Sequence, residues 1–226
     1  MEGLGVPWSN VLSGEVAADT IIVPEPAQCF RPNVHMLARL RQTLAASFEL
    51  DMTPVWQRQG AGARVPQVLI VPRHKPPRKM RSPQRLARRL RAALGTRATV
   101  RVYTDAEMTS PRATLRAFND ATVVIGMYGA NQANVLACRP GALVVEVMAP
   151  ETRHHPVDPM YMLMATRMGL RYYGVGGAGY GHRDGVQLPM DEIVHRVQLF
   201  INSLGDSAAV DAAPFIRWND LHLNEC

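Results

Sequence analysis

The sequence predicts an α/β fold with a doubly wound parallel sheet, and two observations support this prediction. Apolar runs such as Val68–Val71 and Ala142–Val147 are continuous rather than alternating, which is typical of strands buried on both faces. Segments with apolar residues at helical spacing separate these runs, and strands that alternate with helices indicate βαβ units. We therefore expect one doubly wound domain at residues 67–204.

The N-terminal part of the chain is less regular. Thr20–Val23 is a candidate strand, residues 33–48 carry apolar positions at helical spacing, and residues 50–66 contain the prolines and glycines of a linker. The sequence thus divides into a partial N-terminal segment with its linker, the α/β domain and a weakly patterned tail: residues 1–60, 67–204 and 205–226.

The helices of the domain have recognisable start and stop signals. A basic loop at Pro72–Met80 follows the first strand, and Ser82 and Pro83 match an N-cap and first helical residue. That helix runs to about Leu94, where Gly95 ends it. The later elements are a strand at Ala98–Tyr103, a helix at Pro111–Asn119 capped by Ser110, a strand at Thr122–Ile125, a loop at 126–131, a helix at 131–138, a strand at Ala142–Val147, a loop at 149–158, a helix at Tyr161–Met168, a strand at Leu170–Tyr173, a Gly-rich loop at 174–185 and a helix at Met190–Leu204.

Composition limits the classes of function without choosing one. The net charge of +6 and the pI near 9.6 fit an anionic ligand, nucleic acid or an acidic membrane surface. The three cysteines form neither a CxxC pair nor a zinc spacing, and the adjacent His154 and His155 have no third ligand at a clear spacing, so we expect no metal site. No apolar run reaches the ~18 residues of a membrane span, and the first residues lack the features of a signal peptide.

The stretch Thr122–Val147 is the most informative part of the chain for function. Its small-residue loop lies at the carboxyl end of a predicted parallel strand, where open α/β sheets bind ligands. Such a loop can present backbone N–H groups and the positive end of a helix to an anion. With Arg73 and Arg78 upstream, it predicts a site for the pyrophosphate of a nucleotide-sugar.

Three blocks carry a resemblance to a known family: VLIVPRHKPPRKM at 68–80, FNDATVVIGMYGANQANVLACRPGALVVEVMAP at 118–150 and MLMATRMGLRYYGV at 162–175. They resemble glycosyltransferase family 61, which includes plant xylan arabinosyl- and xylosyltransferases and animal O-linked N-acetylglucosaminyltransferases. The middle block is similar to the family's ADVLVGPHGAGLTNLLFMPPGTVVVEL in order and spacing. With a weaker match at QCF (28–30), the likeness covers roughly residues 28–200.

The resemblance implies a GT-B-like fold, of which this chain keeps the C-terminal donor lobe with a truncated N-terminal lobe. It implies metal-independent, inverting transfer of xylose, arabinose or N-acetylglucosamine from a UDP-sugar to a glycan or protein acceptor, without a cofactor. The full-length parent is expected in the lumen of the Golgi or endoplasmic reticulum. Two residues depart from the pattern: Tyr128 replaces the histidine of the family's His-Gly-Ala-Gly, and Pro72 replaces the serine before the first arginine.

The resemblance also implies roles for individual residues. Arg73 and Arg78 would hold the donor pyrophosphate. The loop after the third strand would assist them, through Gly129, Ala130, Asn131 and Asn134. The catalytic base is not assigned.

Several of these residues have a second, structural interpretation. A carboxylate in an apolar strand is costly unless paired, and a ribose hydroxyl pair is a natural partner for Glu146. Tyr128 either stacks on the base or caps the core. Asn131 contacts the ligand or caps the following helix, and Asn134 contacts the ligand or hydrogen-bonds the loop.

Two rival functions remain open at this stage. A non-catalytic fragment or pseudoenzyme of the family fits Tyr128 and the short N-terminal part. A basic nucleic-acid-binding α/β protein fits the arginine-rich segment 81–94, although aromatic residues do not interleave with its charges. We therefore interpret this segment as a solvated helix face and expect no nucleic-acid partner. Salt-dependent binding to any DNA or RNA would support the nucleic-acid alternative, whereas saturable UDP binding would favour the transferase.

Overall fold

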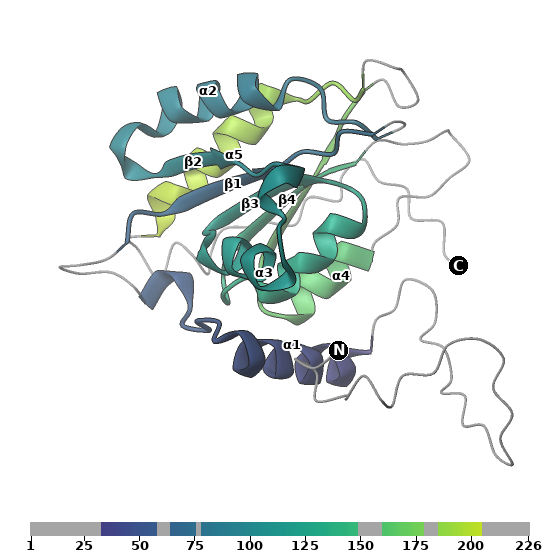
Figure 1. Cartoon of the computed structure of the whole chain (residues 1–226). Helices are drawn as coiled ribbons and strands as arrows, with labels where there is room; N and C mark the ends of the chain where they lie inside the picture. Colours follow the sequence, from purple (N-terminus) through teal and green to yellow (C-terminus); the bar gives the residue numbers. More distant parts are fainter. Residues whose placement is uncertain (1–32, 58–63, 76–77, 149–159, 179–184, 205–226) are drawn as a thin grey trace, which may run out of the picture.

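The computed structural model describes residues 33–57, 64–75, 78–148, 160–178 and 185–204. These residues form a five-stranded parallel sheet with the order β2-β1-β3-β4-β5, which confirms the predicted α/β fold (Figure 1). The strands are β1 (Gln67–Val71), β2 (Thr99–Val102), β3 (Val123–Met127), β4 (Leu143–Met148) and β5 (Arg171–Gly176). No helix among the described residues is long and apolar enough to cross a membrane.

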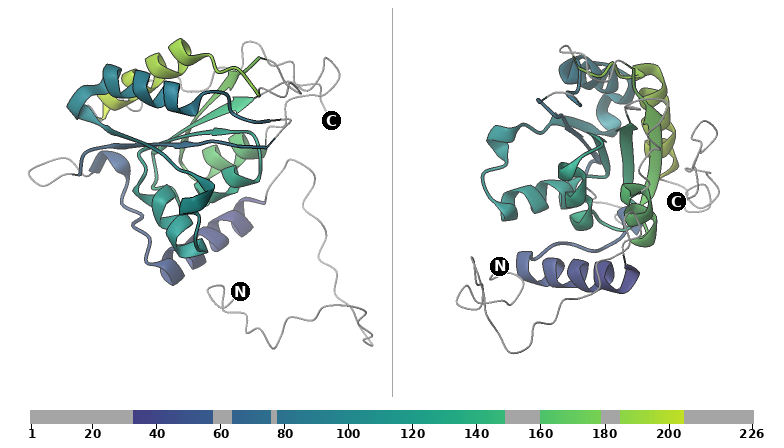
Figure 2. Two further views of the ribbon diagram at one scale, coloured as in Figure 1. Left: turned by 45° about the horizontal axis from the view of Figure 1, so that its top comes forward. Right: turned by 90° about the vertical axis from the view of Figure 1, so that its right-hand side faces the viewer.

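Helices cover both faces of the sheet (Figures 1 and 2). On one face, α2 (Pro83–Leu94) packs beside α5 (Met190–Ser203). On the other lie α3 (Pro111–Asp120), the 3₁₀ helix η6 (Ala130–Ala137) and α4 (Met160–Arg167), and α1 (Val34–Phe48) packs outside them. Short 3₁₀ turns complete the described elements: η3 (Val55–Gln57), η4 (Gly95–Arg97) and η5 (Asp105–Glu107).

The burial of the strands follows their order in the sheet. Every residue of β3 and β4 is buried, and β1 is buried after its first residue, because these strands have neighbours on both sides and helices on both faces. The edge strand β2 exposes Thr99 and Arg101 instead. The continuous apolar runs of the sequence therefore correspond to the centre of the sheet.

The helix caps confirm the predicted starts of two helices and the predicted end of one. The Ser110 hydroxyl accepts a hydrogen bond from the Ala113 N–H at 3.1 Å, and Gly95 ends α2 with φ of 56°. Ser82 and Pro83 are the N-cap and first residue of α2, as predicted. The Ser82 backbone adopts the left-handed conformation (φ 55°), and its side chain makes no capping hydrogen bond.

Three predicted boundaries need correction. Strand β3 continues to Met127 because its ladder with β4 extends through Gly126 and Met127, so the loop begins later than position 126. Residues 174–176 belong to β5, paired with β4, rather than to the Gly-rich loop. The helix predicted at 131–138 is a 3₁₀ helix that begins at Ala130. The candidate strand at 20–23 and the histidines at 154 and 155 lie outside the described residues.

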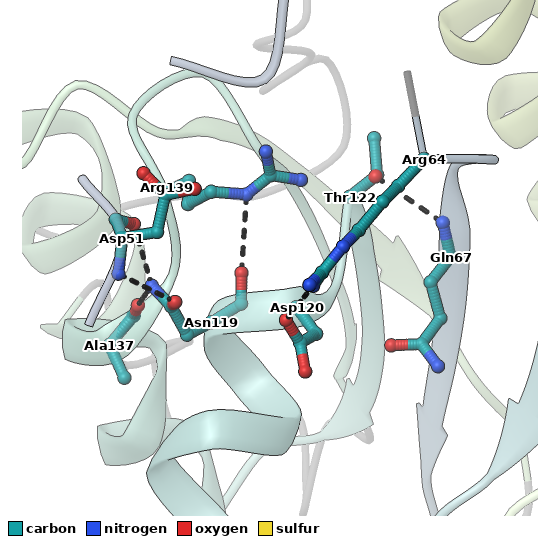
Figure 3. Close-up of polar contacts among 8 residues, drawn as sticks. All are labelled: Asp51, Arg64, Gln67, Asn119, Asp120, Thr122, Ala137 and Arg139. Carbon is teal, nitrogen blue, oxygen red and sulfur yellow. Dashed lines mark hydrogen bonds and ion pairs between the residues drawn. The ribbon is translucent and has the colours of Figure 1, made fainter. Parts of the chain in front are cut away.

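The segment before β1 is attached to the rest of the domain by polar and apolar contacts. The Arg41 guanidinium on α1 donates hydrogen bonds to the carbonyl oxygens of Cys138 and Met168. The Asn119 amide donates to the carbonyl oxygens of Asp51 and Ala137, both at 2.8 Å, and accepts from the Asp51 N–H at 2.9 Å (Figure 3). Helix α1 and the residues that follow it therefore form an outer layer of the same fold.

Cys138 provides a prediction for solution chemistry. Complete burial raises the pKa of its thiol to about 12, and thiolate is the reactive form. We expect iodoacetamide at pH 8.5 to leave Cys138 unmodified in the folded protein and to modify it in urea, as read by peptide mass spectrometry. The raised pKa also means that this thiol's contribution to stability is complete below about pH 9 and decreases as the pH rises toward 12. Rapid modification of the native protein would contradict the prediction.

Candidate functional site

The strand order creates a crevice at the carboxyl ends of β1 and β3. From β1 the chain crosses to β2 on one side, whereas β3, β4 and β5 follow one another on the other side. In open α/β sheets, ligands bind where the direction of winding reverses in this way. The segments that leave β1 and β3 at this point carry Arg73 and Gly129.

A cavity of about 160 Å³ occupies this switch point. It brings together four predicted site residues, Arg73, Gly129, Ala130 and Asn131. The remaining lining residues are Val71, Pro72, His74, Lys75 and Met127. We call this the switch-point cavity. The sequence placed His74 and Lys75 in the basic loop at Pro72–Met80 without a role of their own; their position shortly after a strand was the available signal.

Arg73 and Gly129 are in direct contact. A Cβ atom on Gly129 would lie 2.5 Å from Nη1 of Arg73, and Gly129 has φ of 153°, which side chains rarely adopt. Glycine at this position therefore lets the guanidinium lie against the loop. The buried Nε of Arg73 has no hydrogen-bond partner among the described residues, so this arginine retains donor capacity for an anion.

Arg78 and Tyr128 form a second contact beside the cavity. The Arg78 guanidinium carbon lies 5.0 Å from the centroid of the Tyr128 ring, and Nη1 lies 3.5 Å from the Tyr128 carbonyl oxygen. Tyr128 also packs against the Tyr161 ring of α4, with centroids 5.6 Å apart in an edge-to-face arrangement. The half-buried Tyr128 ring is thus positioned by α4 and by Arg78; whether it also contacts a base stays a prediction.

The loop asparagines occupy different positions from one another. Asn131 is exposed inside η6, and the N-cap of η6 is Gly129, so the interpretation of Asn131 as a cap was wrong. Asn134 donates from its side-chain amide to the Asn131 carbonyl oxygen at 3.1 Å, which confirms that it can hydrogen-bond the loop. This bond fixes the turn that borders the cavity.

Glu146 lies away from the switch-point cavity, in the middle of β4. It is fully buried and accepts a hydrogen bond from the Tyr172 hydroxyl at 2.6 Å. Its neighbours in register are Gly126 of β3 and Gly174 of β5. The expected pairing of this carboxylate is present within the protein, and a ribose contact stays a prediction.

Gln132 is a polar residue beside the loop that the sequence analysis did not identify. It is buried, its carboxamide lies over Gly126, where an added Cβ would be 2.9 Å away, and neither its oxygen nor its nitrogen has a hydrogen-bond partner among the described residues. A buried group left unsatisfied costs about 1–3 kcal/mol. The loop is therefore folded at some cost to stability.

This cost leads to a prediction for Gln132→Met. Methionine keeps the length of the side chain and removes both polar atoms, so we expect the free energy of unfolding to rise by about 1–3 kcal/mol in urea titrations. The control is Gln84→Met on the exposed side of α2, which should change stability by less than about 0.5 kcal/mol. A clear loss of stability in Gln132→Met would contradict the prediction.

The charges around the switch-point cavity are positive. Arg73 and Lys75 line it, and no lining residue carries a carboxylate. In the described part of the chain, no three His, Cys, Asp or Glu side chains gather as a metal site would require. The arrangement can hold an anion by arginine, lysine and backbone N–H groups.

Comparison with known protein families gives this geometry a context. Residues 4–145 match the sequence model of the family Glycosyltransferase 61. The chain belongs to the glycosyltransferase 61 family. The matched span exceeds half of the chain and includes β1, β3 and η6, which build the switch-point cavity.

The membership identifies the chain as a glycosyltransferase of family 61. Its third sequence block, at 162–175, lies beyond the matched residues. No curated protein matches the chain. The donor, the acceptor and the course of the transfer therefore belong to the proposal below.

Proposed function

We propose that this glycosyltransferase binds a UDP-sugar at the switch-point cavity and transfers the sugar, with inversion and without a metal ion, to a glycan or protein acceptor. The carrying observation is the contact between Arg73 and Gly129, which holds a guanidinium with unused donor capacity at the switch point. A guanidinium group recognises phosphate oxygens through paired N–H donors, so it would bind the diphosphate of a nucleotide-sugar.

The proposed chemistry assigns a clear task to the arginines. The acceptor hydroxyl attacks the anomeric carbon and gives its proton to a base, while the bond to the diphosphate breaks and its electrons remain on the phosphate oxygen. Arg73 and Arg78 stabilise that developing charge. Each charge-assisted hydrogen bond is worth about 1.5–3 kcal/mol.

Glu146 enters the proposal as the ribose ligand, with a condition set by the structure. Its carboxylate already accepts from the Tyr172 hydroxyl, so ribose must replace that bond or use the other carboxylate oxygen. The described sheet would form the donor lobe of a GT-B-like enzyme whose acceptor lobe and catalytic base lie elsewhere. Family resemblance favours the Golgi or endoplasmic reticulum lumen for the full-length protein.

Thermal unfolding of the purified chain with UDP, GDP, CMP and UTP tests the donor proposal. We expect UDP to raise the melting temperature, since a ligand at 100 times its Kd adds about 2.7 kcal/mol to stability. Arg73→Ala should abolish the shift, and Arg88→Ala, an exposed arginine on α2, should keep it.

The other outcomes separate the rivals. Stabilisation by UDP without measurable sugar transfer would favour a pseudoenzyme, for which Tyr128 in place of histidine is the specific observation. A cooperatively folding protein that none of the nucleotides stabilises would contradict the donor site. Salt-dependent binding to unrelated DNA or RNA would instead favour a nucleic-acid partner.

A further inference from the structure

A larger cavity, of about 590 Å³, lies between the first turns of α2 and α5. Its volume falls in the range of small-molecule sites. One wall comes from residues around the start of α2, including Arg81, Arg85 and Arg89, and the other from the start of α5, including Asp191 and Glu192. We call it the α2–α5 cavity. Nothing in the proposed donor site uses it.

The basic wall of this cavity is regular. Arg81 precedes α2, and Arg85 and Arg89 follow at intervals of four residues, which places side chains on one side of a helix. That helical spacing applies to Arg85 and Arg89, since α2 begins at Pro83, and Arg81 reaches the same cavity from the segment before the helix.

The acidic wall is already engaged with partners. Asp191 forms an ion pair with Arg89, and Glu192 accepts a hydrogen bond from the Tyr173 hydroxyl. That hydrogen bond and burial raise the pKa of Tyr173, burial being the larger cause. Within the described ranges, the Arg81 and Arg85 guanidinium groups have neither an ion pair nor a hydrogen bond. The cavity thus keeps two available cations.

A short stretch of chain links the residues that line the two cavities. The Met80 N–H donates to the Arg73 carbonyl oxygen at 2.8 Å, which closes the basic loop on itself. The next residue, Arg81, donates from its N–H to the Val186 carbonyl oxygen at 3.0 Å. Met80, only 2% exposed, therefore links Arg73 of the switch-point cavity to Arg81 of the α2–α5 cavity.

We propose that the α2–α5 cavity binds an oxyanion, a carboxylate or sulfate, carried by the sugar acceptor. This inference rests on the proposed function, since a neighbour of the donor site is where an acceptor must approach. A guanidinium matches the paired oxygens of either group through two parallel N–H donors. Arg81 and Arg85 supply two such forks on one wall.

Calorimetric titration of the whole chain tests the proposal with three trisaccharides. They are trigalacturonic acid, its uncharged methyl ester and a sulfated galactose trisaccharide. We expect at least one acidic probe to bind at least tenfold more tightly than the ester, and R81Q/R85Q to weaken that binding by at least about tenfold. The matched control is R39Q/R88Q, which removes the same charge from exposed positions on α1 and α2.

Any one of three results would overturn the proposed acceptor site. These are failure of both acidic probes to bind, equal losses of affinity in the two double variants, or binding of inorganic phosphate as tight as that of the acidic sugars.

UDP titrations separate this inference from the donor proposal. Both double variants should bind UDP as the parent chain does. If UDP binding is weakened in R81Q/R85Q but not in the control, the cavity belongs to the donor site and the inference is overturned. If the chain binds acidic sugars but does not bind UDP, only the donor proposal is contradicted.

Discussion

Replacing Gly129 with alanine is expected to weaken UDP binding by about 10–100-fold, the range that corresponds to losing one charge-assisted hydrogen bond. The added methyl group would lie 2.5 Å from Nη1 of Arg73, and the backbone φ of 153° opposes any side chain at this position. Relief of the clash must move the guanidinium or the loop. Either movement separates the two groups proposed to hold the diphosphate. Calorimetric titration with UDP provides the measurement.

A control distinguishes this local effect from general damage to the sheet. Gly176 at the end of β5 has open space around the position of a Cβ, so Gly176→Ala should bind UDP as the parent chain does. Circular dichroism melting of both variants establishes that each is folded. Affinity within about twofold of the parent in folded Gly129→Ala would show that the close contact with Arg73 does not shape the donor site.

Gly141→Ala is expected to lower the free energy of unfolding by about 2–4 kcal/mol, which combines a backbone cost with overpacking. Gly141 precedes β4 with φ of 77°, and its missing Cβ position falls on the aromatic ring of Trp56 in η3. A tryptophan ring cannot yield as the end of a flexible chain would. Urea titration followed by far-UV circular dichroism measures the loss.

A second glycine isolates the steric part of this effect. Gly169 has a similar φ of 69° but nothing within 4 Å of its Cβ position. Gly169→Ala should therefore cost only the backbone term, about 1–2 kcal/mol. Equal losses in the two variants would argue against the packing of Trp56 on Gly141.

The predictability of the fold differs between its centre and its boundaries. The runs at Val68–Val71 and Ala142–Val147 identified central strands because burial on both faces demands unbroken apolar sequence. The end of β3 was predicted too early, at Ile125. A glycine normally indicates a loop, and here Gly126 continues the strand because it pairs with Glu146 of β4. Likewise, Ser110 and Ser82 both precede a proline and both occupy an N-cap position, but only the extended backbone of Ser110 lets its side chain accept a capping hydrogen bond.

The candidate site shows the same division. The loop motif and the basic segment predicted Arg73 and Gly129 as site residues, and the sheet order brings the two together at one cavity. The need of Glu146 for a partner followed from elementary solvation, but its pairing with Tyr172 depends on the register between β4 and β5. Gln132 could not be singled out, because its lack of partners is a property of the packed loop.

The attachment of α1 bears on where this molecule can be cut. A fragment that begins at β1 would lose Arg41, which caps two carbonyl groups at the amino-terminal edge of the sheet, and Asp51, which bonds Asn119. It would also lose Leu50 and Val55 from the core. The apolar residues that these two side chains cover would then be exposed to solvent, and exposed apolar surface promotes aggregation. A fragment meant to fold on its own should therefore keep α1 and the residues between it and β1, even though prolines and glycines give that stretch the composition of a linker.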